Sequence, residues 1–305
     1  MVLVNHHTGL RRSRRSRDDR AATYRERRLV KRDDGLIGLE GEFTQADVAA
    51  LAAHGAIDKL SFTQRATPLT EPVARGLASI ASVDYFWLWC VVTRAAMRHV
   101  FALPGLRELH VCGLARPGRL CGAAQAANLE IFRSSWLTES DLLELARSPT
   151  LRELAAHGST ITPRVVDALA AMPRLESLDI EDSRFDDAMA QRLAASPTIV
   201  SLWVCNTRLT GRGLAALCGM RQLRALDLWM TKIAAADLAL LATLPELDTI
   251  SLGSYDGDPD ALRGRDVVPA LRKIRKLKTV WLDGVALSAS ERRAIEKRYP
   301  NVRIS

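Results

Sequence analysis

The sequence lacks the marks of several protein classes. None of its apolar runs approaches the roughly 18 to 20 residues of a membrane-spanning helix, and no apolar stretch follows the N-terminal arginines as it would in a secretory or twin-arginine signal. The cysteines are odd in number and widely spaced, without a C-x-x-C pair, which favours reduced thiols over a disulfide framework. We therefore expect a folded, cytoplasmic protein. The five cysteines are Cys90, Cys112, Cys121, Cys205 and Cys218.

Signatures of catalysis are also missing: the chain has no G-x-S-x-G, P-loop, G-x-G-x-x-G or H-E-x-x-H motif. The aspartates of DGDPD (256–260) resemble part of a calcium loop, but Val267 stands where such a loop needs a bidentate glutamate. His99, His110, Cys112 and Cys121 are spaced too irregularly to indicate a zinc site. The sequence thus predicts no metal, no cofactor and no enzyme activity, with an enzyme site in the 254–266 segment as an alternative.

Positive charge is concentrated at the N-terminus. Residues 1–35 contain eleven Arg or Lys and five Asp or Glu, a net charge of +6, which leaves only +2 of the total +8 for the rest of the chain. Arginine-rich segments without apolar periodicity are typically solvated and disordered, so residues 1–35 are predicted to be a basic tail. An alternative is that the RRSRRSR stretch contacts nucleic acid. Its arginines are Arg11, Arg12, Arg14, Arg15 and Arg17.

A repeat with a period of roughly 24 residues organises the rest of the chain. Four consecutive segments, starting at residues 151, 175, 199 and 223, have apolar residues at positions one, four, six and eleven, and most close with a proline. Continuing the frame in both directions predicts ten repeats. Two are irregular, because the repeat over 106–125 is shorter than the others and the one over 247–276 is longer. The six further starts are Ile57, Val83, Leu106, Ala126, Leu247 and Leu277.

This pattern resembles the leucine-rich repeat family, whose signature is L-x-x-L-x-L-x-x-N/C-x-L, over residues 57–301. The resemblance implies an α/β solenoid shaped like a horseshoe, with parallel strands on the concave face and short helices on the convex face. Members of the family serve as inhibitors, receptors, adaptors and secreted effectors. The chain departs from the signature at the ninth position, where it has small hydroxyl side chains: Ser134, Ser159, Ser183, Thr207 and Thr231.

Each repeat also has local signals for a strand and a helix. Positions four to six alternate between apolar and other residues, as in a strand buried on one side. Position twelve is a suitable helix N-cap, and the closing proline ends the helix before the next strand. Residues 36–56, with Thr44 as a cap, are predicted to be a degenerate first repeat, and residues 302–305 a last partial strand. The predicted N-caps of the repeats are Thr162, Asp186, Thr210 and Ser288.

Side chains at positions five and seven are expected on the concave face, because they alternate with the buried positions four and six. These two columns contain five of the six tryptophans, with acidic residues between them, and we expect this face to bind a partner. The alternative is that the aromatic rings only stack on one another and stabilise the sheet. The candidate binding residues are Tyr85, Trp87, Trp89, Phe132, His157, Asp179, Glu181, Trp203, Asp227, Trp229 and Trp281.

The function predicted from the sequence is therefore a non-catalytic scaffold that binds another protein. The acidic residues of the concave face favour a basic partner and disfavour nucleic acid there. Such a scaffold would act as an inhibitor, an immunity protein or an adaptor. Two alternatives are a nucleic-acid-associated adaptor that uses the arginine-rich tail and a secreted effector directed at a host.

Overall fold

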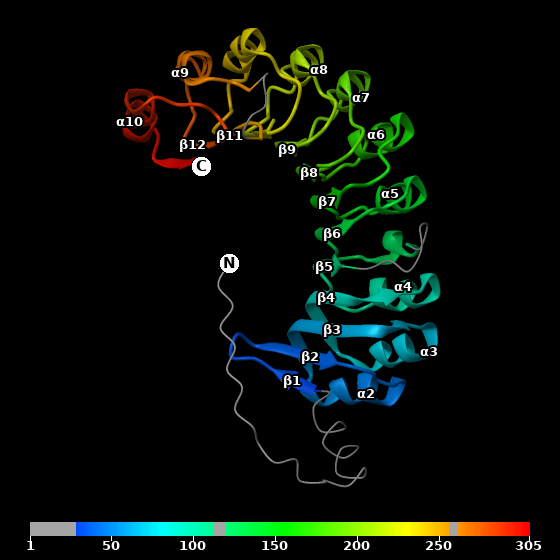
Figure 1. The fold of residues 1–305 in the computed structure, drawn as a ribbon. Helices are drawn as coiled ribbons and strands as arrows, with labels where there is room; N and C mark the ends of the chain where they lie inside the picture. The colour runs from blue at the N-terminus through cyan, green and yellow to red at the C-terminus, as the bar shows by residue number, and fades with distance from the viewer. Residues whose placement is uncertain (1–28, 113–119, 256–260) are drawn as a thin grey trace, which may run out of the picture.

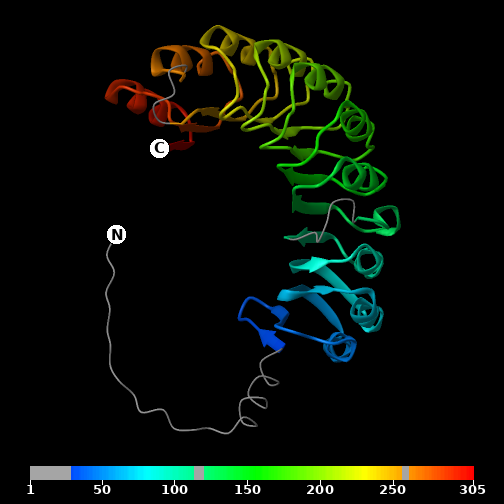
Figure 2. The ribbon, with the colours of Figure 1, turned by 45° about the vertical axis from the view of Figure 1, so that its right-hand side comes forward.

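The computed structural model describes residues 29–112, 120–255 and 261–305. They form an arch in which one continuous sheet lines the inner side and the helices lie outside (Figure 1; Figure 2). The sheet has 13 strands that follow one another in chain order, and all neighbours pair in parallel except β1 and β2. This is the predicted α/β leucine-rich-repeat solenoid. Among the described residues, no helix has the length and apolar character to cross a membrane.

The strands and helices alternate along nearly the whole chain. The strands are β1 (Leu29–Lys31), β2 (Leu36–Glu40), β3 (Ala56–Leu69), β4 (Ser82–Val92), β5 (Glu108–Val111), β6 (Ile131–Ser135), β7 (Glu153–His157), β8 (Ser177–Asp179), β9 (Ser201–Trp203), β10 (Ala225–Asp227), β11 (Thr249–Gly253), β12 (Thr279–Asp283) and β13 (Asn301–Ile304). The α-helices are α2 (Gln45–Ala49), α3 (Glu71–Ala74), α4 (Arg94–Phe101), α5 (Glu139–Leu145), α6 (Pro163–Ala170), α7 (Asp187–Leu193), α8 (Gly211–Leu217), α9 (Gly264–Leu271) and α10 (Ala289–Arg298). The 3₁₀ segments are η1 (Ala50–His54), η2 (Arg75–Ser79), η3 (Ala123–Gln125) and η4 (Ala235–Thr243).

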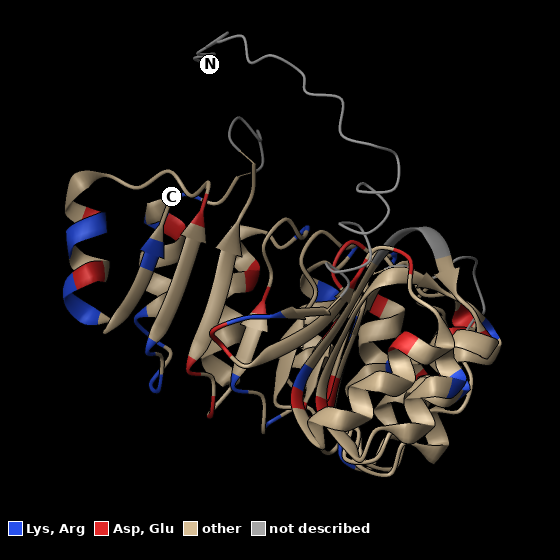
Figure 3. Ribbon diagram, turned by 90° about the horizontal axis from the view of Figure 1, so that it is seen from below, with Lys and Arg blue, Asp and Glu red and all other residues tan. Residues whose placement is uncertain are grey.

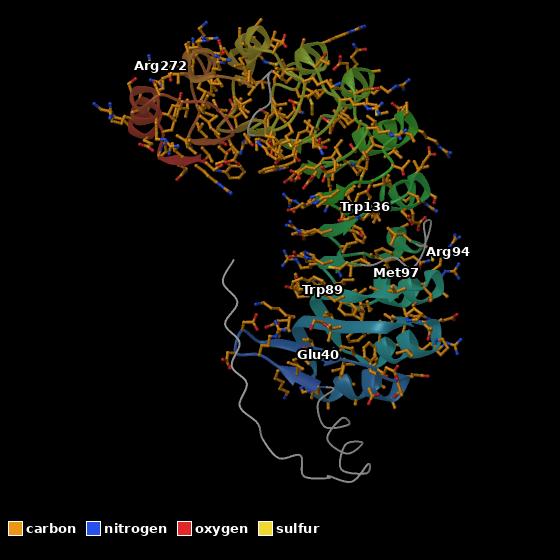
Figure 4. The ribbon with its side chains drawn as sticks, in the orientation of Figure 1. Glu40, Trp89, Arg94, Met97, Trp136 and Arg272 are labelled. Atoms are coloured by element: carbon orange, nitrogen blue, oxygen red, sulfur yellow. The ribbon has the colours of Figure 1, made fainter. Side chains whose placement is uncertain are left out.

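The core lies between the sheet and the helices and continues from repeat to repeat. Leu154, Leu178, Leu202 and Leu226, at position four of successive repeats, are paired in register and are at most 1% exposed. On the helical side, Met97 of α4 faces the sheet and is fully buried, whereas Arg94 lies on the outer side of the same helix (Figure 4). Because no single repeat can enclose its apolar side chains, each depends on its neighbours for its core.

The helix starts follow the predicted capping pattern. The side chains of Thr162, Asp186, Thr210 and Ser288 each accept a hydrogen bond from a backbone N–H in the first turn of the following helix. The hydroxyls at position nine also bond to backbone. Ser159 Oγ accepts from the Leu137 N–H at 2.9 Å. These contacts satisfy backbone groups that the sheet and the helices leave free.

Position eight turns the chain out of each strand in a left-handed conformation. Trp136, Asp182, Asn206 and Met230 have φ between 50° and 59°, and Gly158, at the same position of its repeat, has φ 63°. Side chains other than glycine and asparagine rarely adopt this conformation, because Cβ crowds the backbone. Its recurrence shows that the repeat imposes the turn on whichever residue occupies the position.

The ends of the solenoid are covered by different elements. At the N-terminal end, β1 pairs antiparallel with β2, and Thr44 caps α2 in a capping box. The sheet therefore includes residues 29–31, which the sequence assigned to the tail. At the C-terminal end, β13 pairs in parallel with β12, and α10 carries both basic and acidic side chains (the helix at the left of Figure 3).

One predicted repeat boundary is wrong. The sequence frame began the fourth repeat at Ala126 and placed Phe132 on the concave face, but Phe132 pairs with Leu109 and Leu154 and is fully buried. The repeat starts instead at Leu129, so the preceding repeat covers 106–128 and is close to the regular length. Position five is consequently Arg133. Ala126 and Leu129 are both buried, which is why their apolar character does not distinguish the two frames.

The corrected frame predicts unequal effects for two adjacent substitutions. Phe132→Ala should lower the free energy of unfolding by about 3–5 kcal/mol because it removes a fully buried ring. Arg133→Ala, on the opposite face of the same strand, should lower it by no more than about 1 kcal/mol. Urea titrations followed by circular dichroism measure both values. A larger loss for Arg133→Ala would show that the strand faces the other way.

Candidate protein-binding face

Side chains at position five form one column along the concave face. Its members are paired in register from strand to strand, so each lies beside the next at the usual spacing of about 4.8 Å. The column is Gly38, Ser61, Trp87, His110, Arg133, Ala155, Asp179, Trp203, Asp227, Ser251, Trp281 and Arg303. From Ser61 to Trp281, every residue of this column except Arg133 is at the concave position that the sequence frame predicted.

The first group of aromatic side chains, here named the N-terminal aromatic cluster, comprises Tyr85, Trp87, Trp89 and His110 on β4 and β5. The Trp87 and Trp89 rings are 5.4 Å apart between centroids, and Tyr85 and His110 are 5.1 Å apart. Trp89 is 51% exposed and lies on the concave side (Figure 4). Phe86 and Leu88, between these residues, enter the core. The alternation is the predicted one.

The second group, the C-terminal aromatic cluster, comprises Trp203, Trp229, Tyr255 and Trp281. Trp203 and Trp281 are 5.5 Å apart between ring centroids although two strands separate them. The two intervening strands have the smaller side chains Asp227 and Ser251 at position five, which are 7% and 6% exposed. These side chains leave room for the two larger rings to meet. Trp203 therefore meets Trp281 across β10 and β11.

Trp229 makes a separate set of contacts within this cluster. Its indole Nε1–H donates to the Asp283 carbonyl on β12 at 3.2 Å, and its ring lies 5.4 Å from that of Tyr255. Position seven of the intervening strand β11 is Gly253, which has φ 138° and no room for a Cβ beside the Asp283 carbonyl. The glycine lets β11 and β12 approach closely there. The five tryptophans of the concave face therefore form two clusters instead of a single row.

Four carboxylates lie between the two clusters and beside the second: Asp179, Glu181, Asp182 and Asp227, here named the acidic centre. Asp179 Oδ1 accepts from the Glu181 N–H at 3.2 Å, and Asp227 Oδ1 accepts from the Trp229 N–H at 2.8 Å. An aspartate at position five thus supports the turn that follows its strand. His157 is bonded to Asp179, and Asp182 accepts from the Asn206 amide at 2.7 Å.

The surroundings of the acidic centre raise several pKa values. Burial, followed by the charges of Asp179 and Asp227, raises the pKa of Glu181 to about 7. Burial also raises the pKa of Asp227, opposed by hydrogen bonds from the Trp229 N–H and Ser251. The bond to Asp179 raises the pKa of His157, although burial acts in the opposite direction. Negative charge is therefore crowded here.

Carboxylates beside the N-terminal aromatic cluster have cationic neighbours. Glu108 lies 2.6 Å from His110 Nε2 and 3.8 Å from Arg133 Nε, and Arg133 also pairs with Glu153. By contrast, within the described part of the chain no lysine or arginine forms an ion pair with the four carboxylates of the acidic centre. Within the described residues, the acidic centre is thus a group of four neighbouring carboxylates without a lysine or arginine counterpart.

The same region contains the one metal-ligand grouping found among the described residues. Ligand atoms of His157, Asp179 and Glu181 all lie within 4.8 Å of one another. The sequence predicted no metal, although its repeat frame placed His157 and Asp179 on the concave face of consecutive repeats. The His and Cys residues weighed from the sequence are dispersed. Cys112 accepts from the Trp87 indole, and Cys121 is buried and donates to the Arg94 carbonyl.

Two exposed aromatic residues were not among the predicted binding residues. Tyr255 is 61% exposed and belongs to the C-terminal aromatic cluster. It lies in the segment after β11, where the repeat frame does not predict which way a side chain points. Trp136 is 77% exposed and occupies the left-handed position eight, outside the two concave columns.

Two sets of predicted site residues lie outside the described part of the chain. They are the nucleic-acid contacts Arg11, Arg12, Arg14, Arg15 and Arg17, and residues 256–260 of the 254–266 segment.

These features define a leucine-rich-repeat solenoid with an open concave face. No protein-family model and no curated protein matches the chain. Among solved structures, an internalin (inlF) from Listeria monocytogenes is similar at a TM-score of 0.55 and 14% identity, over 89% of this chain and 82% of that one. An internalin C2 (inlC2) from the same species has a TM-score of 0.47 and 18% identity, over 69% and 84% of the two chains. At these identities the first similarity confirms the fold alone.

The acidic centre should make stability depend on pH. The pKa of Glu181 in the folded state, about 7, lies above its ordinary value of 4.5, so its contribution to stability is lost as the pH rises from about 4.5 to about 7, and the contribution of His157 is lost as the pH rises from 6.5 through its raised pKa. The free energy of unfolding should therefore fall as the pH rises from about 4.5 to above 7. Glu181→Gln should stabilise the protein at pH 8 by about 1 kcal/mol, allowing for solvent screening, and flatten this dependence.

Glu40→Gln is the control for this prediction, because Glu40 is an exposed glutamate at position seven of β2. Denaturant titrations at several pH values measure the free energies. An unchanged slope in Glu181→Gln, or the same change in Glu40→Gln, would contradict the assignment of the pH dependence to the acidic centre.

Proposed function

We propose that the protein is a non-catalytic binding protein that holds a basic partner protein on its concave face. One observation carries the proposal: two clusters of exposed and half-buried aromatic rings flank four carboxylates that have no described lysine or arginine partner, all on one open sheet surface. Aromatic rings supply most of the binding energy in many protein interfaces, and complementary charge speeds association and selects the partner.

The stacking alternative accounts for only part of this arrangement. Trp203 and Trp281 contact each other across two strands, and this contact stabilises the sheet. Trp89 and Tyr255, however, remain 51% and 61% exposed, so the rings do not cover one another completely. Their remaining exposed area supports a role in binding a partner.

An acidic concave face suits an inhibitor or an immunity protein that covers a basic surface of its target, and an adaptor would use the same face. The described cysteines are all free thiols, which supports the cytoplasm as the location in this proposal. The internalin similarity supports protein binding only at the level of fold, because a fold does not define its partners.

Two double variants test the proposal, one in each aromatic cluster: Trp87→Ala with Trp89→Ala, and Trp203→Ala with Trp281→Ala. Partners captured from native lysate by the unaltered chain are identified, purified and titrated against both variants. We expect at least a tenfold loss of affinity for each, because central aromatic residues commonly contribute that much. Affinity for the unaltered chain should also fall as salt is raised.

Trp136→Ala is the matched control, since it removes an equally large and more exposed ring away from the concave columns. It should leave affinity unchanged, and circular dichroism should show that all variants remain folded. Binding that survives both double variants would contradict the proposal. Loss of the folded spectrum in the Trp203 and Trp281 variant would instead favour a purely stabilising role for that pair.

A further inference from the structure

We propose that residues 11–17 of the chain itself, RRSRRSR, dock on the acidic centre of the concave face. This segment lies outside the described residues. Three properties of the molecule support the docking: the charge of the two surfaces, the point at which the tail leaves the sheet, and the length of chain between them. The regulatory consequence, that the tail competes with a basic partner, rests on the proposed function. The docking itself does not.

Charge complementarity is the first property. The segment has five arginines and no acidic residue, whereas residues 36–305 are almost neutral overall. The four carboxylates of the acidic centre lie on or directly after neighbouring strands and have no described lysine or arginine in an ion pair. Guanidinium groups bind carboxylates through paired hydrogen bonds. The indole of Trp203, in register between Asp179 and Asp227, offers an aromatic face to the same cations.

The second property is the direction in which the tail leaves the sheet. β1 is antiparallel to β2 and pairs Leu29 with Leu39, next to the carboxyl end of β2 at Glu40. The chain preceding Leu29 therefore leaves at the edge where all the parallel strands end. Glu181 and Asp182 follow the carboxyl end of β8 at this same edge. Glu40, near the exit of the tail, lies on the concave side (Figure 4).

The third property is reach. β8 is the seventh strand beyond β1 in the sheet, which corresponds to about 34 Å at the usual strand spacing. The stretch from Arg17 to Leu29 spans up to about 40 Å when extended. Arg17 can thus reach β8, and the arginines before it can reach β9 and β10. A tether of this length gives an effective concentration of about 1 mM, enough to fill a site of modest affinity.

A peptide competition tests the docking in the full-length chain. The probe is a fluorescent synthetic peptide, GLRRSRRSR, which corresponds to residues 9–17. It is titrated by anisotropy, at about 50 mM salt, against the unaltered chain and against a full-length variant in which the five arginines of the segment are changed to glutamine. If the tail occupies the acidic centre, the variant should bind the peptide about tenfold more tightly, because its site is free.

Further substitutions in that glutamine variant locate the site. Asp179→Asn with Glu181→Gln should reduce peptide affinity at least tenfold. Asp167→Asn with Glu296→Gln, which removes the same charge from exposed positions on the outer helices α6 and α10, should leave it unchanged. Both pairs keep the shape of the side chains. A peptide with the arginines replaced by glutamine should not bind either protein.

Three results would overturn the docking. Equal peptide affinity for the unaltered chain and the glutamine variant would show that the tail does not occupy the site. Peptide affinity that is unchanged by Asp179→Asn with Glu181→Gln would show that the peptide binds outside the acidic centre. If the peptide does not bind the glutamine variant at low salt, the chain has no site for it. If the peptide binds the unaltered chain and the glutamine variant equally, and the glutamine variant has lost oligonucleotide binding, the tail binds nucleic acid instead. No external partner is used, so these results are independent of the test of the proposed function.

Discussion

The burial of each repeat's apolar side chains against the next repeat is the interaction on which the whole structure depends. A single strand and helix of this chain have too little apolar surface to enclose a core, so the repeats are stable only as a stack. Stacking in constant register places Leu154, Leu178, Leu202 and Leu226 side by side. It also aligns the residues between them on the other face. The concave columns are therefore a consequence of how the core forms.

The concave face combines structural and surface roles in the same residues. Asp179 and Asp227 accept hydrogen bonds from the backbone of the turns that follow their strands, which explains why aspartate suits position five in these two repeats. The same carboxylates also contribute negative charge to the concave face, and Glu181 adds to it. Burial raises the pKa of Glu181 to about 7. Stabilising the turn needs only the aspartate at position five, so it does not explain the additional carboxylate of Glu181. The crowded charge is the physical basis of the proposal that a cationic ligand binds this part of the face.

The tryptophans have a similar double role, and their distribution separates the two halves of the arch. In the C-terminal half, Trp203 and Trp281 contact each other across two strands, while Trp229 donates a hydrogen bond to the backbone of β12. In the N-terminal half, Trp89 remains half exposed beside Trp87. Ring contacts in the C-terminal half stabilise neighbouring repeats, and each half still presents a ring that is more than half exposed, Trp89 in one and Tyr255 in the other. A partner that spans the arch would meet both rings with the acidic centre between them.

The sequence by itself determined the period, the fold class, the helix caps and the direction of most concave side chains, because these depend on spacings within one repeat. It misplaced Phe132, since both Ala126 and Leu129 satisfy an apolar first position and only packing between repeats selects Leu129. Only the tertiary structure decided which side chains make contacts across several strands, as Trp203 and Trp281 do. Those contacts depend on the size of the side chains on intervening strands and on the curvature of the sheet, neither of which a repeat pattern specifies.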